Sequence, residues 1–187
     1  MSTGYRIYEK DGAHFLTFQV VGWVDLFTRR DYRNVVIESF KYCQQHKGLN
    51  LFAFVIMSNH IHLLAQSEVG DLSGFIRDFK SYTSKRFLEI MESGTESRRE
   101  WMKRVFEHYA TYKEKQAHQL WTHENHAEHI YSQKFIEQKV QYIHNNPVRS
   151  GIVAKPEDYL YSSARNYAGL ESVIDVIEVD FRWQTYH

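Results

Sequence analysis

Two histidines separated by one hydrophobic residue are the first candidates for chemistry in this sequence. His60 and His62 flank Ile61 in the segment HIHLLAQ, whose apolar run after a polar pair predicts a β-strand. Residues i and i+2 of a strand project from the same face, so both imidazoles point together while Ile61 anchors the opposite face. Two imidazoles fixed in this way can bind a divalent metal ion when a third ligand approaches from another element. The simpler alternative is that the pair only lines a polar face of the sheet.

A phenol and an amide four residues apart form a second candidate set. Tyr142 and Asn146 lie in QKVQYIHNNPV, where helical spacing puts both on one face and turns Ile143 toward the core. Asn146 can offer a carbonyl oxygen to a hard metal ion, and Tyr142 can attack a phosphorus atom that the metal has made more electrophilic. The structural alternatives are a half-buried aromatic at 142 and, at 146, a helix-terminal amide of the kind favoured before proline.

The order of the predicted elements places these residues in an α+β fold. A first strand is predicted for Ala13–Trp23, followed by a helix from Arg30 to about His46 that Gly48 ends. Two strands, over 49–57 and from His60, then form a hairpin, and a helix runs from Asp71 to about Met91. Strand, helix, hairpin, helix and a further strand is the order of a split βαβ sandwich, in which helices cover one face of an antiparallel sheet.

The rest of the chain is predicted to decorate a single domain over residues 1–187. A charged helical insertion is expected at 93–119, and a strand followed by a turn at 121–131. Ser132 should begin a helix that runs through Asn145 and ends there, because Pro147 cannot donate a backbone hydrogen bond. A C-terminal extension over 148–187 contains a short helical pattern, and its tail after Glu171 is either an edge strand or loose.

Composition limits the classes of function. The 23 Lys and Arg residues balance the 23 Asp and Glu residues, which argues against coating of duplex DNA by bulk attraction, so any contact with nucleic acid must be local. One such contact is predicted for a basic row with an interleaved aromatic, formed by Arg77, Lys80, Tyr82, Lys85 and Arg86. The alternative is an ordinary solvated helix face. With Cys43 as the only cysteine and no apolar segment long enough to cross a membrane, we expect a cytoplasmic protein.

Two segments resemble a known family. FVIMSNHIHLLAQ and, later, KFIEQKVQYIHNNPVRSGIV are similar to the HUH single-tyrosine transposases of bacterial insertion sequences, and in particular to the REP-associated tyrosine transposases. The motifs occur in the family's order, and the resemblance extends from AHFLTFQV to YSSARNYAG. It implies a ferredoxin-like sandwich with helical additions, Tyr142 as nucleophile, and a Mg²⁺ or Mn²⁺ ion held by His60, His62 and Asn146. Asn146 stands where many members carry glutamine, and Ser58 where proline is common.

The function that this resemblance implies is a metal-dependent single-stranded DNA endonuclease and strand transferase. Tyr142 would form a 5′-phosphotyrosine link and release a 3′-hydroxyl, on a single strand that carries a hairpin. A phenol with a pKa near 10 needs help from a metal ion or a base to act as a nucleophile at neutral pH. His144 is a candidate base, but its position on the helix points it away from Tyr142, and it is expected at the surface. The alternatives are a non-cleaving single-stranded nucleic-acid-binding module and a relative of replication or conjugation initiators. A homodimer and a monomer both remain open.

Overall fold

A computed structural model describes residues 12–94, 96–110 and 117–180 of the chain. Its strands are β1 (His14–Gln19), β2 (Leu49–Ile56), β3 (His60–Ser67) and the two-residue β4 (Glu128–His129), which form one sheet in the order β2-β3-β1-β4. All pairings are antiparallel. The order confirms the split βαβ arrangement, because β1 and β2 are separated by β3, the second strand of the hairpin.

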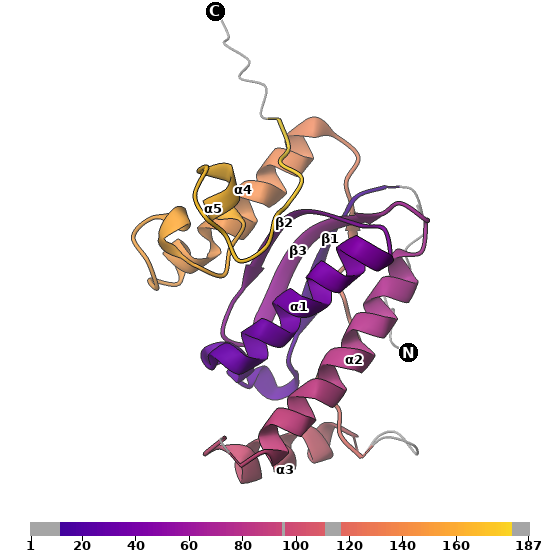
Figure 1. Ribbon diagram of the computed structural model, residues 1–187, viewed down its shortest axis with the longest axis vertical. Helices are drawn as coiled ribbons and strands as arrows, with labels where there is room; N and C mark the ends of the chain where they lie inside the picture. The colour runs from indigo at the N-terminus through magenta and orange to yellow at the C-terminus, as the bar shows by residue number, and fades with distance from the viewer. Residues whose placement is uncertain (1–11, 95, 111–116, 181–187) are drawn as a thin grey trace, which may run out of the picture.

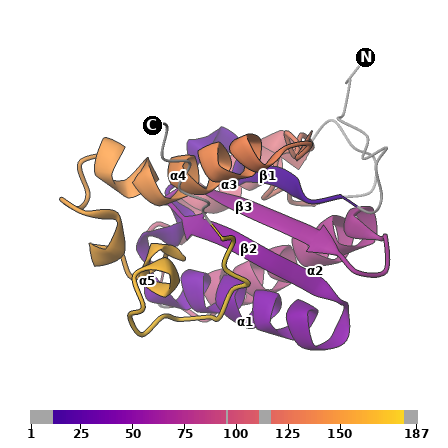
Figure 2. The ribbon, with the colours of Figure 1, turned by 90° about the horizontal axis from the view of Figure 1, so that it is seen from above.

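Helices pack on both faces of this sheet. The long helices α1 (Arg30–His46) and α2 (Leu72–Glu92) cover one face, as the α+β sandwich predicts, and α4 (Gln133–Arg149) lies as an additional helix across the other (Figure 2). The helix α3 (Arg99–Ala110) lies within the predicted charged insertion, near the end of α2 that is remote from α4 (Figure 1). The described chain contains no helix long and apolar enough to cross a membrane.

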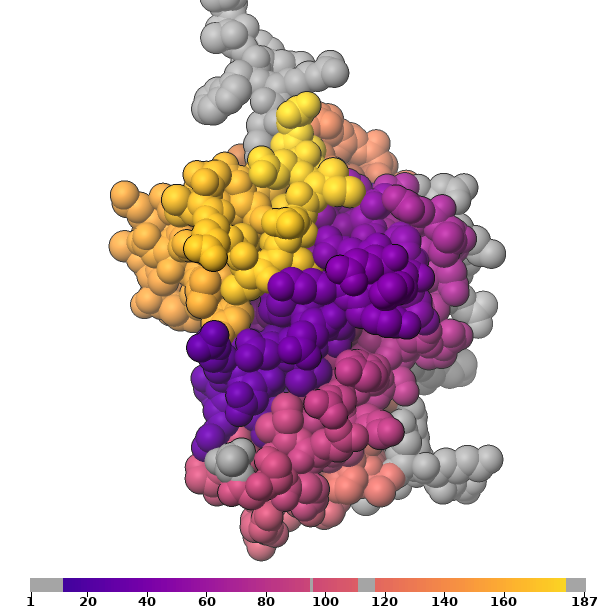
Figure 3. Space-filling model, in the orientation of Figure 1, coloured from indigo at the N-terminus to yellow at the C-terminus, as the bar shows by residue number. Residues whose placement is uncertain are grey.

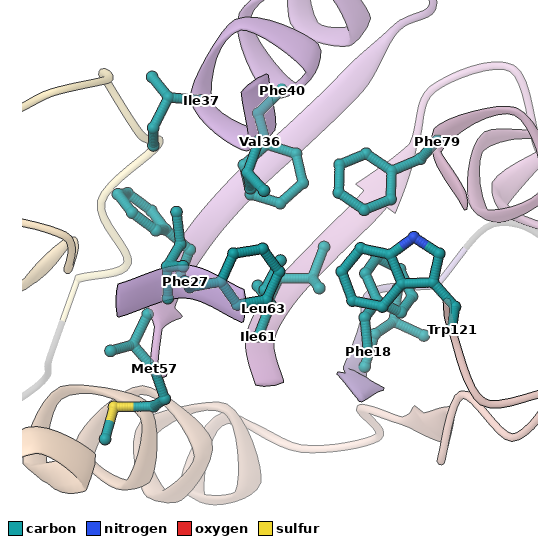
Figure 4. Close-up of a cluster of buried hydrophobic side chains, with 14 of the residues drawn as sticks. Phe18, Phe27, Val36, Ile37, Phe40, Met57, Ile61, Leu63, Phe79 and Trp121 are labelled. Carbon is teal, nitrogen blue, oxygen red and sulfur yellow. The ribbon is translucent and has the colours of Figure 1, made fainter. Parts of the chain in front are cut away.

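The core between the sheet and α1/α2 is dominated by aromatic side chains. Phe18 of β1 stacks on Phe79 of α2 with ring centroids 5.2 Å apart, and Phe79 in turn stacks on Phe40 of α1 at 5.1 Å. Ile61 and Leu63 of β3 point into the same cluster (Figure 4). Since side chains alternate along a strand, His62, which lies between them, faces α4 instead.

Local signals set most element boundaries as predicted. Asp71 caps α2 by accepting a hydrogen bond from the Gly74 backbone N–H at 2.8 Å. Gly48 adopts a left-handed conformation with φ of 61° just after α1, the backbone state that ends a helix at glycine. The first strand is shorter than predicted, because it ends at Gln19 and a 3-10 turn, η1 (Val21–Trp23), redirects the chain.

The prediction that α4 ends at Asn145 is wrong, because the helix continues through Pro147 to Arg149. Proline lacks the N–H that would donate to the carbonyl four residues earlier, and its ring crowds that carbonyl, but here both effects fall in the last helical turn. The Ser150 N–H still donates to the Asn146 carbonyl at 3.1 Å, and Pro147 is buried. Burial of the ring therefore offsets the local cost, and α4 continues to Arg149.

The C-terminal extension covers the outer edge of β2, the edge strand of the sheet. It contains the short helices η3 (Pro156–Asp158) and α5 (Ala164–Tyr167), and no strand lies in its described tail. The Ile56 N–H donates to the Tyr161 carbonyl and the Ser163 N–H to the Phe54 carbonyl, while Ile177 donates to Leu51. These contacts satisfy backbone groups that an open sheet edge would leave available for pairing with another chain.

A buried carboxylate joins α1 to the segment after α2. Glu96 is 4% exposed and forms ion pairs of 3.0 Å with both Arg29 and Arg98. It also accepts a hydrogen bond from the Tyr32 hydroxyl at 3.3 Å. Burial by itself would raise the pKa of Glu96, but the hydrogen bonds and charge of Arg98, together with the charge of Arg29, outweigh it and lower that pKa.

Replacing Glu96 with glutamine should therefore lower the free energy of unfolding. We expect a loss of roughly 2 kcal/mol at pH 7, less than for a fully buried pair because both arginines are partly exposed. The pKa of Glu96 is lower in the folded protein than in the unfolded chain. Its contribution to the free energy of unfolding is therefore present at pH values above the ordinary carboxyl pKa, and it is lost as the pH falls through the lowered pKa. Urea unfolding at several pH values measures this difference, and Glu89→Gln, at an exposed ion pair with Arg86, is the control. Equal stability of the two variants at pH 7 would contradict the role of Glu96.

Candidate active site

The two histidines lie side by side on the face of the sheet that α4 covers. His60 and His62 begin β3, and their ring centroids are 4.7 Å apart. His62 is 6% exposed and pairs across the sheet with Thr17 of β1, while His60 is half-buried at the start of the strand. The spacing of one residue thus places both imidazoles at one spot, as the sequence predicts.

Each imidazole is oriented by a hydrogen bond at Nδ1. His60 Nδ1 lies 2.8 Å from the Asn59 side-chain oxygen, to which it can donate, and His62 Nδ1 lies 2.9 Å from the Thr17 hydroxyl. A hydroxyl can accept the Nδ1 proton, and in that tautomer Nε2 carries the lone pair. Both rings can then offer Nε2 as a ligand, with its direction fixed by the partner at Nδ1.

Helix α4 brings Tyr142 to these histidines within the same chain. The Tyr142 ring centroid lies 5.2 Å from that of His62 and 5.8 Å from that of Phe15 on β1. Val140 and Ile143, on either side of Tyr142 in the sequence, are buried and attach α4 to the fold, whereas Tyr142 remains 38% exposed. The phenol is therefore held beside the His62 imidazole and is still open to solvent.

Burial keeps both imidazoles in their neutral form. It lowers the pKa of His60, and it lowers the pKa of His62 to about 3, with further contributions from the neighbouring His60 and from Lys139. A neutral imidazole is the protonation state that binds a metal ion. The buried positions therefore favour ligation over positive charge at neutral pH.

The donor set fits a divalent ion that shares its coordination with substrate or water. The described chain contains no group of three His, Cys, Asp or Glu residues that could hold a metal. Oxygen ligands would have to complete the pair of imidazoles. Asn146 lies one turn after Tyr142 on the same face of α4 and is half-buried, so its amide oxygen stays the predicted third ligand. Two imidazoles and an amide leave coordination positions open, as catalytic metal sites require.

His144 has a structural role that the sequence did not reveal, and its prediction as a surface residue is wrong. Its Nε2 lies 2.9 Å from the Ser163 hydroxyl, and its ring packs edge-on against Tyr167 with centroids 4.9 Å apart. Burial lowers the pKa of His144 to about 4. The residue joins α4 to the C-terminal extension on the side away from the histidine pair, and only its long-range partners show this.

The basic row predicted on α2 is not one continuous surface. Lys80 turns inward, where its ammonium donates to the Thr122 carbonyl at 2.8 Å and to the Asn125 side chain. Arg77 and Arg86 are exposed but paired with acids, Asp78 and Glu89 respectively.

Tyr82 and Lys85 line a groove of about 880 Å³ between α1 and α2. Both helices are seen at the surface in Figure 3. The helices α1 and α2 that form this groove cover the sheet face opposite to α4 (Figure 2), whereas His62 contacts Tyr142 of α4. The structure therefore does not bring the row on α2 and the candidate active site together.

Comparison with known proteins agrees with this fold. Residues 24–108 match the model of the family described as IS200-like transposases. Over its whole fold the chain is similar to a REP-associated tyrosine transposase solved bound to a REP hairpin, with a TM-score of 0.59 and 22% sequence identity over 97% of this chain and 95% of that one. A comparison with curated proteins gives no significant match.

These matches confirm the resemblance to IS200-like transposases that the two motifs predict, and they confirm the α+β fold. The family match includes His60 and His62 but ends before Tyr142, so the place of the tyrosine is known here from the contacts of α4.

Lys80→Met should destabilise the protein, whereas Arg86→Met should not. Methionine keeps the apolar contact with Phe18, whose ring centroid lies 5.3 Å from the Lys80 ammonium, but leaves the Thr122 and Asn125 oxygens without their donor. We expect a loss of about 1–3 kcal/mol for Lys80→Met and less than about 0.5 kcal/mol for the exposed pair of Arg86. Thermal and urea unfolding measure both. Equal stability of the two variants would show that Lys80 is not a structural residue.

Proposed function

We propose that this protein is a metal-dependent single-stranded DNA endonuclease and strand transferase, a transposase that acts through Tyr142. The observation that carries the proposal is the 5.2 Å separation of the Tyr142 and His62 rings within one chain. Because one chain supplies both the phenol and the imidazoles, a single catalytic set requires no second protomer. The similar solved structure is bound to a REP hairpin, and we propose a hairpin-bearing single strand as the substrate here.

The chemistry of the chain consists of one reversible exchange of phosphate esters. The Tyr142 oxygen forms a bond to phosphorus, the bond from phosphorus to the 3′-oxygen breaks, and that oxygen takes up a proton to leave a 3′-hydroxyl. The 5′-phosphate stays on Tyr142. A second 3′-hydroxyl can attack this ester and restore the phenol, so the phosphotyrosine bond conserves the energy needed to join a new strand.

His60, His62 and Asn146 would hold the divalent ion, Mg²⁺ or Mn²⁺, next to the phenol. Such an ion supplies Lewis acidity toward a phosphate oxygen. The residues of the chain supply position. Asn59 and Thr17 orient the imidazoles through Nδ1, and the buried side of α4 fixes Tyr142 over them. Correct placement of nucleophile and phosphate accounts for much of the rate enhancement in such reactions.

Replacing Tyr142 with phenylalanine should abolish covalent attachment to DNA. We expect the wild type, mixed with a hairpin-bearing single strand and Mn²⁺, to shift on a denaturing gel, and the yield for Tyr142→Phe to fall on the order of 10³-fold or more. Tyr109→Phe is the matched control, since Tyr109 on α3 is 40% exposed. Adduct formation by both variants would show that another residue is the nucleophile.

The main competing function is a binding module that does not cleave. It would bind the hairpin tightly without forming an adduct, whichever divalent ion and flanking sequence were used. That result, with the wild type folded and bound, would overturn the enzymatic proposal and leave the fold assignment intact.

Thr17→Val should weaken Mn²⁺ binding, because valine has the shape of threonine but cannot accept the His62 Nδ1 proton. Loss of a group that orients a ligand typically costs about 10–100-fold in metal affinity. Thr17→Ser keeps the hydroxyl and should bind within about threefold of the wild type. Titration of free Mn²⁺ by electron paramagnetic resonance measures this without DNA. Equal affinities for the valine and serine variants would exclude the orienting role of Thr17.

A further inference from the structure

The face of α4 that carries Tyr142 also carries two cations. Four residues at spacings of three, four and three form a single stripe along the helix: Lys139, Tyr142, Asn146 and Arg149. The buried residues of α4, Val140, Ile143 and Pro147, form the neighbouring stripe that faces the fold. The two charges therefore flank Tyr142 along the helix, one on each side.

The two cations differ in how far their charge is matched within the protein. Lys139 is 17% exposed, lies 2.8 Å from the Glu128 carboxylate and sits 4.2 Å from the Phe15 ring centroid. Arg149 is exposed, and none of the described acidic side chains lies within ion-pair distance of it. The unmatched positive charge of the stripe is therefore at Arg149.

Arg149 reaches back along the helix to the nucleophile. Its guanidinium carbon lies 5.6 Å from the Tyr142 ring centroid, although the two residues are almost two turns apart. Long side chains on a helix point toward its amino terminus, which brings this one back to the Tyr142 ring. An exposed cation above a ring is held only weakly. The planar fork of N–H donors therefore remains available to an anion.

We propose that Arg149 binds the phosphate that Tyr142 attacks, with guanidinium N–H groups donating to its non-bridging oxygens. This inference rests on the proposed function and adds to it a phosphate subsite formed by Arg149 on α4. A guanidinium matches phosphate geometry with two parallel hydrogen bonds and keeps its protons at all physiological pH values. Arg149 thus takes no part in proton transfer. It stabilises the negative charge on the equatorial oxygens while the Tyr142 oxygen bonds to phosphorus and the 3′-oxygen leaves.

A purely structural role is the competing explanation, because Arg149 is the last residue of α4 and a cation there favours the helix terminus. Lysine would serve that purpose equally well, but it cannot form the two parallel hydrogen bonds. The variants Arg149→Lys and Arg149→Gln therefore separate the two roles. Lys134→Gln removes one positive charge from the exposed surface of the same helix and is the control for general electrostatics.

The first measurement is the rate of adduct formation at saturating hairpin-bearing DNA with Mn²⁺. We expect Arg149→Gln to be slower by about 10²-fold, Arg149→Lys by about tenfold, and Lys134→Gln to stay within about twofold, with unchanged circular dichroism and melting temperature in all three. If the wild type forms the adduct and Arg149→Gln forms it equally fast, the role of Arg149 is overturned while the proposed function stands. Equal rates for Arg149→Lys and the wild type would show that the two parallel hydrogen bonds are not needed.

The second measurement does not depend on cleavage, so it also decides the case in which the wild type forms no adduct. In the Tyr142→Phe background, binding is compared for oligonucleotides in which one neutral methylphosphonate is moved along the single-stranded flank. If Arg149 contacts one phosphate directly, a methylphosphonate at that position weakens DNA binding by the protein that retains Arg149. The same methylphosphonate has no effect on DNA binding by the Arg149→Gln variant. Additive losses at every position would overturn the phosphate contact.

Discussion

The two-residue period of β3 is the constraint on which the site depends. Ile61 and Leu63 must enter the aromatic core on the α1/α2 side, and this turns His60 and His62 to the other face. A slip of one residue in the register would bury the histidines in the core and expose the isoleucine. The same hydrophobic contacts that stabilise the sandwich therefore also fix the direction of both imidazoles.

Helix α4 converts this pair into a site by covering it without closing it. Val140, Ile143 and Pro147 are buried, and Tyr142 is left partly exposed beside His62. Burial is the main cause that lowers the pKa of His62 to about 3, and the charges of His60 and Lys139 add to it. Attachment of the helix thus determines the place of the phenol beside a buried, neutral His62.

Local patterns in the sequence were enough to predict the features that depend on neighbouring residues. The hairpin, α1, the Asp71 cap and the pairing of His60 with His62 follow from alternation, helical spacing and capping. The features that were missed depend on distant partners. Ser163 draws His144 inward, Thr122 and Asn125 draw Lys80 inward, and burial of Pro147 extends α4. No local rule contains those contacts.

The electrostatics of the α4 face, on the proposed function, couple the two ligands that the site must bind. Two neutral imidazoles supply no positive charge to attract a phosphate, and the charge of Lys139 is offset by Glu128. Among the described residues, Arg149 is then the one unmatched cation of the stripe, and by itself it binds an anion only weakly. A phosphate oxygen would complete an oxygen-poor donor set around the ion, and the ion would neutralise the phosphate. Each ligand then raises the affinity for the other by the same factor. His60 and His62, neutral because they are buried, would make the site responsive to DNA and divalent ion together.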